Sequence, residues 1–158
     1  MPILYASPPR DEDLGKSMGN SAYSCSDIKK WGAENATTGV YWIKVASKGY
    51  RKVFCDMETD GGGWTLFFNY RHFPGTDLFL NSQKIPENMN VNSHMDLANA
   101  GFIEKDVKEV RFFCKEKSRN RRYFWHFKNT SFGVIDTALT GNQKNLNVFY
   151  YFNLGKRL

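Results

Sequence analysis

The amino-acid sequence predicts an α+β domain built mainly on an antiparallel β-sheet, with short helices and long loops. The first observation is a series of aromatic and β-branched runs separated by turn-forming residues, which is typical of antiparallel strands. The second is an aromatic content of 16%, because large flat side chains favour strands. The third is a length of 158 residues without an internal repeat, which fits one domain.

The chain begins with a polar stretch, residues 1–24, that has neither the basic start nor the apolar core of a signal peptide. We expect this stretch to be a flexible leader and residues 25–158 to form the domain. If the protein is secreted, its signal has been removed or lies upstream of this numbering. No apolar run reaches the roughly 18 residues of a membrane-spanning helix, so we expect no membrane span.

A short helix and a β-hairpin are expected next. Residues 24–32 form one or two helical turns, with Ser24 or Ser26 as N-cap and Gly32 ending the helix with a positive φ. Two strand-like runs then flank the turn at residues 47–49 and predict a hairpin.

A glycine triplet, residues 61–63, interrupts the strand pattern before an apolar strand that begins at Trp64. Three glycines predict a sharp turn or a close backbone approach. A phosphate-binding loop would need a Lys-Ser/Thr pair after the glycines, and Trp64 stands there instead. The triplet is therefore interpreted as structural.

The second half of the chain begins with a loop-like stretch, residues 73–91. Residues 92–102 predict a short helix, capped by Ser93 and ended by Gly101. The further strand candidates are residues 107–114, 121–129, 131–139 and 147–154.

The three cysteines leave two compartments open. In an oxidising compartment Cys25 and Cys55 could pair and leave Cys114 odd, whereas in the cytosol all three would be reduced thiols. Neither C-x-x-C pairs nor zinc-finger spacings occur, so no structural zinc is expected. Two N-glycosylation sequons, at Asn35 and Asn129, tilt the balance slightly toward secretion.

One segment is more specific. It carries CSDI (25–28), TGVYWI (38–43), CDM (55–57) and TDGGGWT (59–65) in this order. Over Cys25 to Phe67 the chain resembles the opening of fibrinogen C-terminal-like domains, the family of fibrinogen chains, ficolins, angiopoietins and tenascins. After about residue 68 the likeness fades, as in a shortened or divergent member.

This resemblance implies that Cys25 and Cys55 form a disulfide and that the protein is secreted or an ectodomain. It also implies that Trp42 and Trp64 pack in the core. The family's second disulfide and aspartate-rich calcium loop have no counterpart here, so the calcium site and the acetyl-group pocket of the ficolins carry over to no residue.

Two clusters are weighed as binding sites. Asp56, Glu58 and Asp60 alternate as carboxylates that could hold Ca²⁺, although turn-capping aspartates give the same pattern. No cofactor is required by the sequence. The second cluster is a basic, aromatic hairpin that could bind a sulfated glycan or another anion, or be an ordinary soluble turn. Its basic residues are Arg111, Lys115, Lys117, Arg119, Arg121, Arg122 and Lys128.

The net charge of +6 favours acidic partners but identifies none. His72, His94 and His126 stand in no catalytic motif, and we expect no enzyme. Cys114 is either a buried thiol or an interchain bridge.

The predicted function is that of a secreted, non-enzymatic recognition module for an extracellular glycan or glycoprotein, with nucleic acid disfavoured. The alternative is an assembly or matrix module that acts through protein–protein contacts as a homo- or hetero-oligomer.

Overall fold

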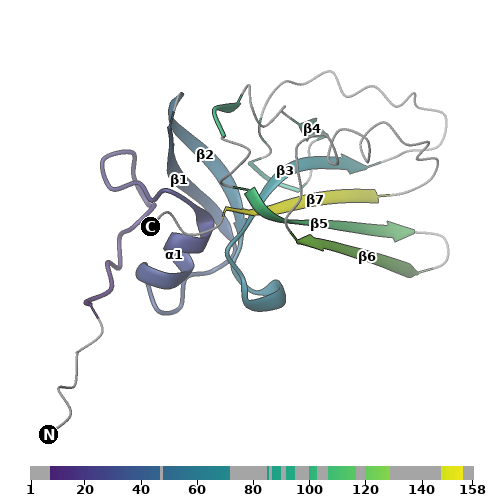
Figure 1. Cartoon of the computed structure of the whole chain (residues 1–158), viewed down its shortest axis with the longest axis horizontal. Coiled ribbons are helices and arrows are strands. Elements are labelled where there is room, and N and C mark those ends of the chain that lie inside the picture. The colour runs from purple at the N-terminus through teal and green to yellow at the C-terminus, as the bar shows by residue number, and fades with distance from the viewer. Residues whose placement is uncertain are drawn as a thin grey trace, which may run out of the picture.

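A computed structural model shows one antiparallel sheet with a short helix against it (Figure 1). The structure describes residues 8–46, 48–71, 85, 87–89, 92–94, 100–102, 107–116, 120–128 and 147–154, with β7 and most of β6 described by their backbone. The elements are α1 (Cys25–Trp31), β1 (Gly39–Val45), β2 (Gly49–Asp56), the 3₁₀ turn η1 (Thr59–Gly61), β3 (Trp64–Arg71), β4 (Ser93–His94), β5 (Val107–Glu116), β6 (Arg121–Lys128) and β7 (Asn147–Leu154). The predicted α+β class is confirmed.

The sheet has the strand order β1-β2-β3-β7-β5-β6, with β4 also paired to β3. In β3, Trp64 to Leu66 pair with β2, and Phe68 and Asn69, further along the strand, pair with β4. The last strand of the chain, β7, lies between β3 and β5. It therefore connects the three N-terminal strands, β1 to β3, to the β5–β6 hairpin.

Helix α1 begins as the sequence predicts and ends differently. Ser24 accepts a hydrogen bond from the amide of Asp27 at 3.0 Å, as an N-cap does. Gly32 ends the helix with a φ of −79°, so the prediction of a positive φ there is wrong. Glycine is needed for space instead, because a Cβ at Gly32 would lie 2.5 Å from the carbonyl oxygen of Ile28.

The β1–β2 hairpin forms as predicted, with Val45 paired to Gly49 across the turn. Its outer edge differs from the expectation of a loose leader. Trp42 donates its amide to the carbonyl of Gly15 at 2.7 Å, and Lys44 donates to Ala22 at 2.7 Å. The N-terminal segment therefore satisfies the edge of β1 that would otherwise expose unpaired backbone groups.

The glycine triplet forms a tight turn, as predicted. Gly61, Gly62 and Gly63 all have a positive φ, between 74° and 84°. A Cβ at Gly62 would collide with the backbone of Met57, and one at Gly63 would lie 2.9 Å from the Cα of Ser26. Both the backbone conformation and the close approach therefore require glycine.

The second half matches the sequence predictions in the strands that the structure describes, and it corrects the expected helix cap. The predicted strands appear as β5, β6 and β7, and residues 131–139 lie outside the described part. Ser93 lies in β4, paired with Asn69, so it is not the expected helix cap. Gly101 has a positive φ, at 97°. The middle of the predicted helix, residues 95–99, is not described.

The described core divides between the two faces of the sheet. The larger cluster contains Ile28, Val53, Phe67, Phe68 and Phe112. A shift of register between Leu66 and Phe68 in the β3–β7 pairing lets two consecutive phenylalanines join this one cluster. The smaller cluster holds Trp64 and Leu66, with Phe54 and Met89 packed against them. The opening of the candidate site lies beside it.

Of the two tryptophans predicted to pack in the core, Trp64 does so and Trp42 does not. Trp64 is buried, and its indole N–H donates to the carbonyl of Thr59 at 2.9 Å. Trp42 is only half-buried, with the ammonium of Lys52 5.3 Å from its ring centroid. Its assignment to the core is therefore wrong.

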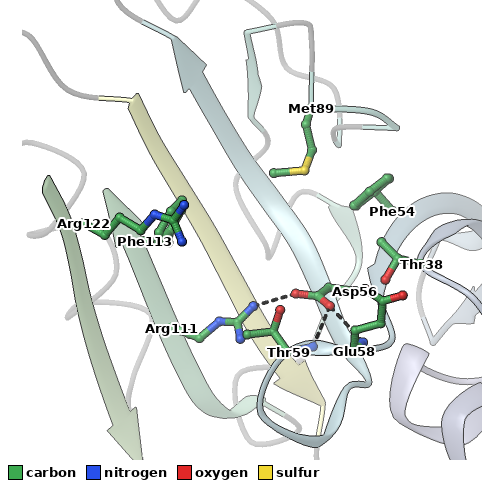
Figure 2. A pocket seen from close by; sticks show the side chains of 9 residues that line it. All are labelled: Thr38, Phe54, Asp56, Glu58, Thr59, Met89, Arg111, Phe113 and Arg122. Atoms are coloured by element: carbon green, nitrogen blue, oxygen red, sulfur yellow. Dashed lines mark hydrogen bonds and ion pairs between the residues drawn. The ribbon is translucent and has the colours of Figure 1, made fainter. Parts of the chain in front are cut away.

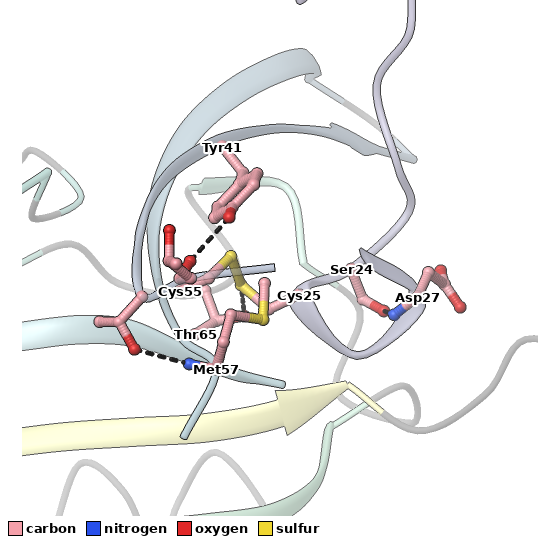
Figure 3. Close-up of a disulfide and its surroundings, with 9 residues drawn as sticks. Ser24, Cys25, Asp27, Tyr41, Cys55, Met57 and Thr65 are labelled. Carbon is pink, nitrogen blue, oxygen red and sulfur yellow. Dashed lines mark hydrogen bonds between the residues drawn. A yellow bond between two sulfur atoms is a disulfide. The ribbon is translucent and has the colours of Figure 1, made fainter. Parts of the chain in front are cut away.

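The predicted disulfide joins Cys25 of α1 to Cys55 of β2, 30 positions apart (Figure 3). Both cysteines are fully buried, and the hydroxyl of Thr65 in β3 donates to the sulfur of Cys25 at 3.0 Å. The bridge therefore fastens the helix to the hairpin at the point where β3 joins them.

The double replacement Cys25→Ser, Cys55→Ser is expected to lower the free energy of unfolding by roughly 3–4 kcal/mol, because a loop of 30 residues is no longer closed in the unfolded chain. Urea denaturation followed by tryptophan fluorescence measures the change. Wild-type protein treated with reductant is expected to match the variant. Equal midpoints for oxidised and reduced protein would contradict the stabilising role.

Candidate functional site

A pocket of about 420 Å³ opens beside the smaller core cluster, between the end of β2 and the β5–β6 hairpin (Figure 2). Its walls combine aromatic and apolar side chains with charged groups and hydroxyls. The lining residues are Thr38, Phe54, Asp56, Glu58, Thr59, Met89, Arg111, Phe113 and Arg122. Pockets with a few polar groups among apolar walls are the usual form of a small-ligand site.

Asp56, the last residue of β2, organises the floor of this pocket. Its Oδ1 accepts the backbone amides of Glu58 and Thr59, each at 3.0 Å, and its Oδ2 accepts from Arg111 at 2.8 Å. Burial alone would raise the pKa of Asp56, but the hydrogen bonds from Thr59, Glu58 and Arg111 outweigh burial and lower it below 3.8. The carboxylate is therefore charged at neutral pH and held in place from two sides.

Arg111 reaches Asp56 from β5, 55 positions along the chain. Its side chain is only 3% exposed, and its guanidinium lies 4.7 Å from the ring centroid of Trp64. A second carboxylate, that of the exposed Asp60, accepts from the same guanidinium at 3.3 Å. Two carboxylates balance the charge of this buried arginine, and the contact with an aromatic ring stabilises it further.

This geometry corrects the prediction that Arg111 belongs to an exposed anion-binding surface. The alternation of β5 explains the difference, because Val110 and Phe112 face the larger core while Arg111 and Phe113 face the pocket. Arg111 is a structural cation, and its positive charge is already balanced by Asp56 and Asp60.

The charged groups that remain open to solvent at the pocket are Glu58 and Arg122, one of each sign. Half-buried Phe54 and Phe113 give apolar surface on either side (Figure 2). An acceptor, a donor and two ring faces suit a ligand with several hydroxyls and an apolar face, and they suit a plain anion less well.

The three predicted calcium ligands do not act together. Asp56 and Asp60 both bind Arg111, while Glu58 lies exposed at the pocket. Within the described ranges no group of three potential ligand residues could hold a metal ion. In this fold Asp56 and Asp60 form ion pairs with Arg111, and the dependence on calcium stays a prediction.

The rest of the predicted basic cluster is placed only in part. Lys115 is half-buried and Arg122 is exposed, and these two residues are paired directly across β5 and β6. Like charges at paired positions repel each other, so an anion bound between them would reduce this electrostatic repulsion. Lys117 and Arg119, and the side chains of Arg121 and Lys128, lie outside the described residues.

Cys114 is buried and carries a free thiol, which agrees with the buried alternative and disfavours an interchain bridge. Burial raises the pKa of this thiol to about 11. The sequon at Asn35 lies exposed in a turn, as glycosylation requires, and Asn129 lies outside the described residues. The histidine side chains also lie outside them.

Sequence reasoning missed the contribution of Thr38, Phe54, Thr59, Met89 and Phe113 to the pocket. One signal was available at Arg111, since a single cation inside the apolar run 110–114 indicates a buried charge with a distant partner. No local pattern could identify that partner as Asp56.

Comparison with known proteins finds a family match for the N-terminal part of the chain. Residues 21–84 match the model of the C-terminal globular domain of fibrinogen beta and gamma chains. This segment is fibrinogen-related. It contains α1, the disulfide, the β1–β2 hairpin, the glycine turn and β3, so the match covers the elements that build the floor of the pocket. Arg111 and Arg122 come from outside it.

Three relatives illustrate the range of similarity. Angiopoietin-4 of Bos taurus is 54% identical over 43 residues, which is 27% of this chain and 8% of that protein. Fibrinogen-like protein A of Apostichopus parvimensis is 41% identical over 59 residues, 37% of this chain and 20% of that protein. Echinolectin 1 of Echinometra lucunter is 36% identical over 69 residues, 42% and 29% respectively. The chain thus spans less than a third of each of these relatives.

No helix of the described residues is long and apolar enough to cross a membrane.

Replacement of Asp56 by Asn is expected to lower the free energy of unfolding by about 3 kcal/mol at neutral pH, because it removes the charge that balances buried Arg111. The matched replacement Asp60→Asn, at a side chain that is 62% exposed, is expected to cost less than about 1 kcal/mol. Urea titrations of both variants measure the difference, and equal losses would contradict the distinction.

The pH dependence follows from the lowered pKa of Asp56. A carboxyl whose folded pKa lies below 3.8 contributes stability above that pH, and the contribution is lost as pH falls through the folded value. Wild-type stability is therefore expected to fall more steeply between about pH 5 and pH 2 than that of Asp56→Asn. Thermal melting across this range is the measurement, and parallel curves would contradict it.

Cys114 is expected to resist alkylation in the folded protein. Its thiol is buried and stays protonated at pH 8, because its pKa is about 11, and the thiolate is the reactive form. Iodoacetamide labelling read by mass spectrometry should give an unmodified protein without denaturant and one label in urea. Rapid labelling of native protein would show that the thiol is accessible.

Proposed function

We propose that the chain is a secreted or cell-surface recognition module, without enzymatic activity, that binds a glycan or glycoprotein at the pocket of Figure 2. The observation that carries this proposal is the composition of the pocket, in which Phe54 and Phe113 flank the exposed charges of Glu58 and Arg122. Its setting beside the fibrinogen-related segment supports it, since one relative of that segment is named as a lectin.

The chemistry of a sugar matches these walls. Sugar hydroxyls both donate and accept hydrogen bonds, so they can bind the carboxylate of Glu58 and the guanidinium of Arg122. The apolar face of a pyranose ring can pack on an aromatic ring such as Phe54. Asp56 and Arg111 hold each other at 2.8 Å, and they give the pocket a rigid floor. A rigid floor lowers the entropy lost on binding.

An acidic sugar suits the same place better than a neutral one. Lys115 and Arg122 are paired across β5 and β6, and Arg122 also lines the pocket. A sialic acid carboxylate or a sulfate beside Arg122 would offset the repulsion between these two cations. Glycoprotein glycans that end in acidic sugars are therefore the ligand class we favour.

The alternative function is assembly through protein–protein contacts. Met18, Tyr23 and Trp31 are exposed by 48%, 51% and 37%, and all three lie in the N-terminal part of the chain. Exposed aromatic side chains are common where proteins meet. Burial of Cys114 disfavours an interchain bridge, so this alternative relies on non-covalent contacts.

A glycan array is the test, run with calcium and again with a chelator. Wild-type protein is expected to bind sialylated or sulfated glycans, and Arg122→Ala is expected to weaken that binding about 10-fold or more, as for loss of a charge-assisted hydrogen bond. Glu58→Gln should weaken it less. The matched control is Lys108→Ala, an exposed cation of β5 outside the pocket lining, which should bind as wild type.

Each other outcome has a clear meaning. Equal losses in Arg122→Ala and Lys108→Ala would show that net charge, and not the pocket, controls binding. Binding lost in chelator would assign a role to a metal ion. A blank array, together with an oligomer in light scattering of the purified protein, would favour assembly.

A further inference from the structure

The outer face of the β1–β2 hairpin is a second surface, which borders the pocket at Phe54. We define the hairpin face by five of its exposed or half-buried residues, which are Val40, Trp42, Lys44, Tyr50 and Lys52. The opposite face of the same hairpin carries Ile43, Val53 and Cys55, all fully buried. Strand alternation thus places an aromatic and basic set on the solvent side of the hairpin.

The residues of the hairpin face are paired by register. Trp42 is directly opposite Lys52, and Lys44 is directly opposite Tyr50. The two lysines are therefore diagonal neighbours, and residues at such positions typically lie roughly 7–8 Å apart across the strand pair. The two aromatic residues occupy the other diagonal. The two cations and the two rings therefore alternate, both along each strand and across the strand pair.

Each lysine stands beside the ring opposite it. The Nζ of Lys52 lies 5.3 Å from the ring centroid of Trp42, and that of Lys44 lies 6.0 Å from the ring centroid of Tyr50. These contacts hold the ammonium groups over the face instead of leaving them free in solvent. Less side-chain entropy is then lost when the cations bind a ligand.

Most side chains of the hairpin face are exposed to solvent. Tyr50 is 43% exposed and Val40 is 46% exposed, while both lysines are exposed. The five positions contain two positive charges and no carboxylate. Unlike Arg111 in the pocket, these cations therefore have no acidic partner within their own face, and the face is complementary to an extended anion.

We propose that the hairpin face binds a sulfated polysaccharide, with sulfate groups on Lys44 and Lys52 and sugar rings against Trp42 and Tyr50. A linear chain suits the open side of a strand pair, on which Lys44, Tyr50 and Lys52 are all exposed. Lysine binds sulfate as a point charge, and ring faces take the apolar side of a sugar. This inference goes beyond the proposed function, because it concerns another surface and a polymer ligand.

Heparin chromatography tests the inference with the full chain. The double variant Lys44→Gln, Lys52→Gln is expected to elute at clearly lower salt than wild type and to bind heparin at least about 10-fold more weakly at 0.15 M NaCl, as for the loss of two ionic contacts. The matched control is Lys29→Gln, Lys108→Gln, which removes the same charge from α1 and β5 and should elute near wild type.

A second variant separates the rings from the charges. Tyr50→Ser keeps both lysines, and it is expected to weaken heparin binding by about 3-fold or more without changing the melting temperature greatly, because Tyr50 is exposed. The pocket is tested with a different ligand, by the binding of sialylated glycans without sulfate to Arg122→Ala, so this test and that of the pocket fail independently.

Three results would overturn the inference. One is equal elution of the lysine double variant and its matched control. Another is unchanged retention on heparin from which the sulfates have been removed. The third is tighter binding, through the same two lysines, of a single-stranded oligonucleotide of similar charge, which would assign the face to phosphodiester polymers.

Discussion

The ion pair between Asp56 and Arg111 is the interaction on which the arrangement of this sheet depends. It connects the last residue of β2, next to the disulfide, to the middle of β5, which lies outside the fibrinogen-related segment. Two charges removed from water are costly unless both are fully bonded. Here the carboxylate also accepts two backbone amides, and the guanidinium also contacts Asp60 and the ring of Trp64. Removal of Asp56 or of Arg111 would leave the other charge buried without its main partner, and this explains why several local features converge on the pair.

The glycine triplet is one of those features. Asp56 accepts the amides of Glu58 and Thr59 directly after β2. The positive φ values at Gly61 to Gly63 then turn the chain back, so that the amide of Gly63 donates to the carbonyl of Asp56 at 2.9 Å. The same turn brings the carbonyl of Thr59 to the indole N–H of Trp64, which then lies beside Arg111. The TDGGGWT sequence is thus a folding motif. It forms the pocket floor without contributing a reactive group.

Sequence reasoning succeeded where the cause of a structure is local. The N-cap at Ser24, the hairpin turn before Gly49 and the glycine turn each depend on residues within a few positions. It failed where the partner is remote. Arg111 was assigned to the surface because its partner lies 55 positions away, and the leader was expected to be loose because its contacts with β1 use backbone groups that carry no side-chain signal. The disulfide is the exception, since it spans 30 positions, and the family resemblance supplied it.

The two proposed surfaces differ in whether the charge of their cations is balanced by a neighbouring carboxylate. In the pocket Arg111 is neutralised by aspartates, so the ligand must be selected by shape and by hydroxyl groups, with Arg122 as the exposed cation. On the hairpin face Lys44 and Lys52 contact only rings among the five residues of that face, and their charge remains available to an anion. A compact acidic glycan therefore suits the pocket, and a repeating sulfated polymer suits the open strand pair. Phe54 pairs with Val40 and also lines the pocket, so the two surfaces border each other at this residue.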